Sequence, residues 1–174
     1  MRNKVISNIK NKYKNYERED NMNKYFKLAI NKAKKTYRNN EGGPFGATIT
    51  DKEGNVIVVA SNQVLKKNDP TAHAEIEAIR KACKKLKTYD LSDYVIYTTC
   101  EPCPMCLSAI IWSNIKQVYY GANKLDAANI GFRDDYIYNY LESRDSNVLK
   151  MNNIDRKECL EIFEEYKELN KEIY

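Results

Sequence analysis

The chain has 174 residues, of which 30% are charged and 43% hydrophobic, a composition typical of one globular domain. It contains no apolar run of about 18 residues that could span a membrane, and its basic N-terminus lacks the apolar stretch of a secretory signal. These features predict a cytoplasmic protein without a membrane partner. Five cysteines, an odd number, argue against a disulfide framework.

The net charge of +5 is unevenly distributed along the chain. The first 40 residues carry 12 basic and 3 acidic side chains, so the remainder is mildly acidic. We interpret residues 1–21 as a basic N-terminal extension and residues 22–174 as the compact domain. An acidic remainder offers no broad attraction to a phosphate backbone, so a nucleic-acid partner is not expected.

Helical and strand patterns alternate from residue 22 onward. Apolar residues at helical spacing predict an amphipathic helix over residues 22–39, and the glycines and proline that follow end it. The next predicted elements are a hairpin of strands at 47–51 and 56–62, a helix at 72–87, a strand at 94–99, a helix at 103–114, a strand at 117–121, short helices and loop at 124–142, a strand at 148–151 and a helix at 155–171. This order predicts a three-layer α/β/α domain around one mixed, five-stranded sheet.

Two short fragments combine residues typical of metal chemistry, and they read His-Ala-Glu (73–75) and Pro-Cys-Pro-Met-Cys (102–106). Cys103 and Cys106 face the same way on one helical turn, and a helix N-terminus favours their thiolate forms. Together with a neutral His73, the only histidine, they form a three-ligand zinc site whose fourth tetrahedral position is open for water. We expect Glu75 to reach that water without binding the metal and to carry its proton.

Two alternatives to a catalytic metal site stay open. Cys100 could act as a fourth ligand and make the site a structural zinc centre, although Glu75 would then have no role. The chain could also be a zinc-stabilised binding module that is tethered by its basic N-terminal arm. The joint pattern His-x-Glu followed by Pro-Cys-x-x-Cys is the signature of zinc deaminases, and it favours an enzyme over both alternatives.

Around these fragments the sequence resembles the cytidine/deoxycytidylate deaminase superfamily and, within it, the bacterial guanine deaminases over about residues 22–174. The matching stretches are Gly-Gly-Pro-Phe-Gly-Ala (42–47), Asn-Asp-Pro-Thr-Ala-His-Ala-Glu (68–75), Ala-Ile-Arg-Lys-Ala-Cys (78–83), Cys-Glu-Pro-Cys-Pro-Met-Cys-Leu (100–107), Gly-Phe-x-Asp-Asp-x-x-Ile-Tyr (131–138) and the ending Asn-Lys-x-x-Tyr (170–174). The zinc-site stretches occur widely in the superfamily and fix only the chemistry. The last two stretches are more specific to guanine deaminases.

The resemblance implies hydrolysis of guanine to xanthine and ammonia, with one zinc ion per subunit. It also implies how the purine is held. Asn62 would hydrogen-bond the base, the backbone of Ala74 would hold the reacting centre, and Asp134 would accept from the edge that carries the exocyclic amine. Phe45 and Trp112 would pack on the ring faces, although an apolar helix face makes Trp112 an equal candidate for plain core.

The resemblance further implies a homodimer. In the family the C-terminal segment, here about residues 145–174, is exchanged between two subunits, so that Tyr174 would complete and cover the partner's pocket. A frayed chain end is the alternative for Tyr174, and the final helix could equally pack on its own sheet.

Two other substrates stay open. A tRNA adenosine deaminase shares both zinc-site fragments, but RNA binding needs a cationic face, whereas residues 158–174 contain six Glu and two Lys. A cytosine or other small-base deaminase would differ only in its pocket residues. The substrate is therefore less firmly predicted than the reaction class.

Overall fold

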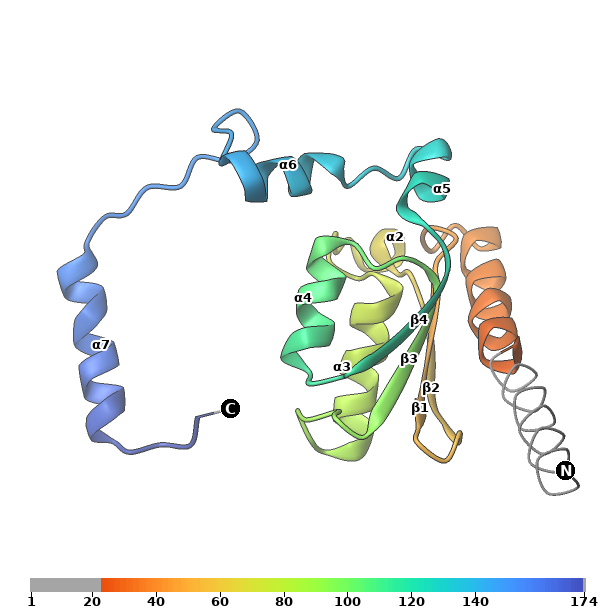
Figure 1. Cartoon of the computed structure of the whole chain (residues 1–174), viewed down its shortest axis with the longest axis horizontal. Helices are drawn as coiled ribbons and strands as arrows, with labels where there is room; N and C mark the ends of the chain where they lie inside the picture. Colours follow the sequence, from red (N-terminus) through yellow and green to blue (C-terminus); the bar gives the residue numbers. More distant parts are fainter. Residues whose placement is uncertain (1–22, 174) are drawn as a thin grey trace, which may run out of the picture. The chain divides into compact units, whose positions relative to one another are not determined.

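The computed structural model describes residues 23–173, which divide into two units after Asp134 (Figure 1). The first unit holds a β-sheet and the helices that cover it, and the second holds the two last helices. The division falls about ten residues before the segment that we expected to be exchanged. The predicted N-terminal extension, residues 1–21, lies outside the described residues.

The first unit is built on a mixed sheet with the strand order β2-β1-β3-β4. Its strands are β1 (Gly46–Asp51), β2 (Val56–Ser61), β3 (Tyr94–Cys100) and β4 (Gln117–Ala122). β1 pairs antiparallel with both β2 and β3, whereas β3 and β4 run parallel. The parallel pair requires a crossover connection, and this connection carries the Pro-Cys-Pro-Met-Cys fragment.

Helices cover both faces of this sheet, as the sequence predicts (Figure 1). One face packs against α3 (Ala74–Leu86) and α4 (Pro104–Trp112), and the small side chains of α3 allow close contact with the strands. The helix of residues 23–38 lies against the other face. It approaches β1 so closely that a Cβ at Gly46 would lie 2.1 Å from the carbonyl oxygen of Ala29, so only glycine fits there.

The prediction of a fifth strand is wrong, because residues 148–151 are not in a strand and the described sheet has four strands. Asp145 accounts for the difference. Its carbonyl accepts from the Val148 N–H and its carboxylate from the Asn147 N–H, which bends the chain into a turn before an extended run can begin. The short helix α2 (Val64–Lys67), in contrast, was not predicted.

The remaining helices are α5 (Lys124–Asn129) in the first unit, and α6 (Asp135–Ser143) and α7 (Arg156–Glu168) in the second. α5 begins with a capping box in which Asn123 and Asp126 satisfy each other's backbone N–H groups. α7 leaves large apolar side chains exposed, namely Ile162, Phe163 and Tyr166. None of the described helices has both the length and the apolar character that a membrane crossing needs.

Candidate metal centre and active site

The two zinc-type fragments lie at the N-termini of α3 and α4. His73 is the N-cap of α3 and Cys103 is the N-cap of α4, and both have extended backbone conformations. An N-cap side chain usually accepts a hydrogen bond from its own helix, but neither of these side chains does so. Neither side chain is taken up by a hydrogen bond to its own helix. The positive ends of the two helix dipoles favour the thiolate form of a cysteine at the point where the helices meet.

The three predicted ligands are brought together by this arrangement. The Nδ1 atom of His73 lies 3.6 Å from the sulfur of Cys103 and 3.5 Å from the sulfur of Cys106. All three donor atoms lie within 4.8 Å of one another. Zinc bound at about 2.3 Å to sulfur and about 2.0 Å to nitrogen requires tetrahedral edges of about 3.6 Å, so the donors fit a zinc ion.

Proton sharing among these donors supports the same conclusion. Hydrogen bonds from Cys106 and His73 lower the pKa of Cys103 to about 4, and the same contact raises the pKa of Cys106. The hydrogen bond to Cys103 also raises the pKa of His73. Three donor atoms thus compete for protons at one point, where a divalent cation can take the protons' place.

Cys100 is separate from this group. It ends β3, and its thiol donates to the carbonyl oxygen of Asn123 at a sulfur–oxygen distance of 3.6 Å. Burial raises the pKa of Cys100 to about 11, so it stays a thiol near neutral pH. In the described part of the chain the metal-type cluster consists of His73, Cys103 and Cys106, which does not support a structural centre with Cys100 as a fourth ligand.

Glu75 lies beside the ligands as the second residue of α3 and is only 5% exposed. Its Oε1 atom accepts from the hydroxyl of Thr98 at 2.8 Å, and its Oε2 atom lies 3.5 Å from the sulfur of Cys106. Burial raises the pKa of Glu75. A carboxyl whose neutral form is favoured in this way can both accept and return a proton, as a general acid and base must.

Asn62 follows β2 directly, and the N–H of the next residue, Gln63, donates to the carbonyl oxygen of Ala72, which precedes His73. The Oδ1 atom of Asn62 accepts from the backbone N–H groups of Gly43 and Val64, at 3.2 and 3.1 Å. With the oxygen bound on that side, the amide group has a fixed orientation and its N–H donors face the other way. Ala74 is fully buried between the ligand His73 and Glu75.

Phe45 lies in the loop before β1, and its ring meets that of Phe132 edge to face, with centroids 4.9 Å apart. Gly43 lies against both rings, since a Cβ there would come within 3.1 Å of each. Asp134 has a pKa raised by burial and, secondly, by the negative charge of Cys103. Its role in binding the guanine edge stays a prediction.

One of the predicted site residues, Trp112, is not brought to the cluster. Trp112 is the last residue of α4, six residues beyond Cys106, which corresponds to about 9 Å along the helix axis. Its side chain is 79% exposed, so it is neither core nor part of this chain's metal cluster. Tyr174 lies outside the described residues.

Thr98 and Phe132 contact site residues, and we did not predict either from the sequence. Thr98 shares a face of β3 with the buried Ile96, so a polar residue at a core-facing position was the available signal. Phe132 lies within the stretch 131–138, which pointed to Asp134 but did not indicate that the neighbouring ring contacts Phe45.

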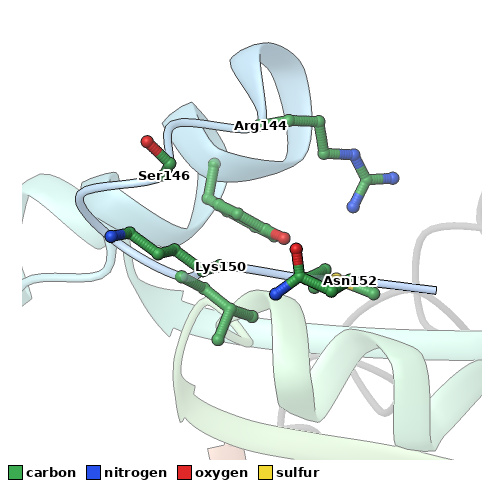
Figure 2. Close-up of a pocket in the computed structure, with 7 residues that line it drawn as sticks. Arg144, Ser146, Lys150 and Asn152 are labelled. Carbon is green, nitrogen blue, oxygen red and sulfur yellow. The ribbon is translucent and has the colours of Figure 1, made fainter. Parts of the chain in front are cut away.

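A separate pocket of about 520 Å³ lies in the second unit and includes none of the site residues described above (Figure 2). Its lining residues are Tyr140, Arg144, Ser146, Leu149, Lys150, Met151 and Asn152. Figure 2 shows the Arg144 and Lys150 side chains extending to opposite sides in this view, so the two cations do not converge on one ligand.

The fold and the cluster together are typical of the zinc-binding region of deaminases. The family model for the cytidine and deoxycytidylate deaminase zinc-binding region matches residues 19–122, and the chain belongs to this family. The three metal-type donors and Glu75 all lie within the matched range.

Individual relatives within this family include deaminases of guanine and of tRNA adenosine. Guanine deaminase of Bacillus subtilis (strain 168) is 55% identical over 101 residues, which is 58% of this chain and 64% of the relative. The alignment thus spans less than two thirds of that relative's length. A tRNA-specific adenosine deaminase of Buchnera aphidicola is 36% identical over 142 residues, 82% of this chain and 91% of the relative. The X-ray structure of guanine deaminase from Bacillus subtilis matches with a TM-score of 0.82 and 42% identity, covering 87% of this chain and 98% of that one.

Proposed function

We propose that this protein is a guanine deaminase, which hydrolyses guanine to xanthine and ammonia with one zinc ion per subunit. The observation that carries the proposal is the buried carboxylate of Glu75 beside a cluster of three metal-type donors. The substrate follows from the similarity to guanine deaminase, which in the structural match extends over most of both chains. A cytoplasmic location stays a prediction.

The reaction replaces the exocyclic C–N bond of guanine by a C–O bond, so protons must move from water to the base. Zinc held by His73, Cys103 and Cys106 would act as a Lewis acid that makes water a nucleophile near neutral pH. The chain itself supplies the proton carrier. Glu75 would take a proton from the attacking water and deliver it to a ring nitrogen. It would then take the second proton of that water, left on the added oxygen, and pass it to the departing amine, so that the C–N bond breaks as the carbonyl forms.

The neighbouring residues would bind and orient the base. The Asn62 amide, fixed through its oxygen, would donate to the purine, and the Asp134 carboxylate would accept from the edge carrying the exocyclic amine. Phe45 would pack on a ring face, and the backbone of Ala74 would hold the reacting centre. These roles follow the resemblance. The backbone hydrogen bonds from Asn62 to Phe45 and from Gln63 to Ala72 support them, because they join this loop to the residue before His73.

Substitution of Asn62 by Asp tests the role of the amide. The variant keeps an oxygen for the N–H groups of Gly43 and Val64 but loses the N–H donors, so we expect the KM for guanine to rise about tenfold or more. Steady-state kinetics measures this change. Asn31→Asp, at an exposed position on the helix of residues 23–38, adds the same charge as a control. A KM for Asn62→Asp within twofold of the wild type would contradict the assignment.

We also propose a homodimer with an exchanged C-terminal segment. Exposed apolar side chains on α4 and α7 support an assembly, because such surfaces gain stability when a second subunit covers them. On α4 they include Ile111 and Trp112, so that Trp112 would lie at a subunit contact.

Deletion of residues 170–174 tests the exchanged segment. The chain should stay folded but lose most of its activity, since the terminal tyrosine would no longer cover the partner's pocket. Thermal unfolding and kcat are measured on the same sample. An unchanged kcat in a folded, truncated protein would contradict the proposal of a terminal lid.

The principal competing function is tRNA adenosine deamination, which the similarity to the Buchnera relative keeps in view. The deciding experiment follows the conversion of guanine to xanthine by ultraviolet absorbance, beside adenine, cytosine, guanosine and a tRNA anticodon stem-loop. We expect turnover of guanine. Reaction of the stem-loop alone would overturn the proposal, and zinc binding without turnover of any substrate would favour a scaffold.

A further inference from the structure

Thr98 places a hydroxyl group in the interior of the sheet. It lies in β3 between two neighbouring strands, opposite Ala47 of β1 and Tyr120 of β4, and it is 0% exposed. Hydrogen-bond ladders on both sides hold this strand, so the position of the hydroxyl is rigid. A buried hydroxyl requires a hydrogen-bond partner, and the partner of this hydroxyl lies outside the sheet, in α3.

That partner is the Glu75 carboxyl group. The distance of 2.8 Å between Thr98 Oγ1 and Glu75 Oε1 is the usual length of a good O–H···O hydrogen bond. An ionised carboxylate only accepts hydrogen bonds, so the hydroxyl donates in that state. The two oxygens of Glu75 are thereby made unequal, because Oε1 is bound to the sheet whereas Oε2 faces the sulfur of Cys106.

We propose, on the basis of the proposed deaminase function, that Thr98 is a positioning residue that fixes the orientation of the Glu75 carboxyl group. The hydrogen bond to Oε1 opposes rotation of the carboxyl plane, so that Oε2 stays turned toward the metal-type donors. Without the Thr98 hydroxyl the carboxyl plane is no longer held, and an oxygen of Glu75 points to the reacting side less often.

The central test compares Thr98→Val, which replaces the hydroxyl by a methyl group of similar size, with Thr98→Ser, which retains it. The free energy of a hydrogen bond to a charged group corresponds to a factor of about 10 to 100 in a rate constant. We therefore expect Thr98→Val to lose about that factor in kcat. The KM should stay within about twofold, because Thr98 does not touch the substrate. Thr98→Ser should retain most of the wild-type kcat, and all variants should contain the wild-type amount of zinc.

Thr48→Val is the matched control. Thr48 is also 0% exposed in the neighbouring strand and also donates one hydrogen bond, but to the backbone carbonyl of Tyr25 at 3.1 Å. Its substitution should lower the melting temperature about as much as Thr98→Val does, with no loss of kcat. Equal losses of kcat in both valine variants, or an equally impaired Thr98→Ser, would reduce Thr98 to a packing role and overturn the proposal.

An infrared measurement on the zinc-loaded protein separates this inference from the proposed function. The Glu75 carboxylate band is identified by its disappearance in Glu75→Gln, and it should shift in Thr98→Val but not in Thr48→Val. If the wild-type protein does not convert guanine, the proposed function is contradicted. The kinetic comparison of the Thr98 variants is then made with the base or RNA that the protein does convert. An unshifted carboxylate band or an unchanged kcat in Thr98→Val would contradict the role of Thr98 and leave the proposed function standing.

Discussion

Substitution of Glu75 by Gln is expected to reduce guanine turnover by at least about 10²-fold while zinc stays bound. The amide keeps the shape of the side chain and an oxygen that can accept from Thr98, but it cannot take up and release a proton. The measurement is kcat from the formation of xanthine, together with the zinc content of the same sample.

Glu77→Gln is the matched control for this substitution. Glu77 lies two residues further along α3, is also buried, and pairs with Lys67 at 2.7 Å instead of facing the metal-type cluster. Its substitution removes the ion pairs with Lys67, Arg80 and Lys81 and lowers stability, but it leaves the proton carrier intact. Near-normal turnover by Glu75→Gln would remove the basis for its assigned role.

The second large effect is expected for the ligand cysteines. Cys103→Ser and Cys106→Ser should each lose most of their zinc and their activity, since even changes to a residue outside the ligand set cost about 10–100-fold in metal affinity. The measurement is zinc content after dialysis against a weak chelator, followed by the turnover assay.

Cys100→Ser provides the comparison, because this thiol is buried nearby and donates to the carbonyl oxygen of Asn123 instead of joining the cluster. A serine hydroxyl can make the same donation. We expect normal zinc content and a normal kcat. Loss of zinc from this variant would restore the alternative of a structural centre with Cys100 as a fourth ligand.

The regular elements of the first unit could be predicted from local sequence patterns. Apolar spacing predicted the helix of residues 23–38 and α3, and runs of β-branched and aromatic residues between turn residues predicted the four strands. The strand expected at 148–151 failed because composition cannot tell a strand from an extended loop that lacks a partner strand. The four-residue helix α2 is too short to show a period.

In the site, too, residues within short local motifs could be predicted, whereas contacts between distant segments could not. His73, Glu75, Cys103 and Cys106 lie in two short fragments with fixed spacing, and the helix N-termini that bring them together could be inferred from the same fragments. The hydrogen bond from Thr98 to Glu75 joins a strand to a helix 23 residues away, so it depends on how the layers pack. Trp112 lies at the C-terminal end of α4, whereas the metal-type donors lie at its N-terminal end. The resemblance that suggested a purine contact for Trp112 did not show this separation.

The account depends most directly on which atoms hold the metal. X-ray absorption at the zinc edge of the purified, full-length protein counts the sulfur neighbours of the ion. Two sulfur atoms, with nitrogen or oxygen as the remaining neighbours, are predicted from the cluster of His73, Cys103 and Cys106. Three or more sulfur neighbours, or a protein that binds no zinc, would contradict the account.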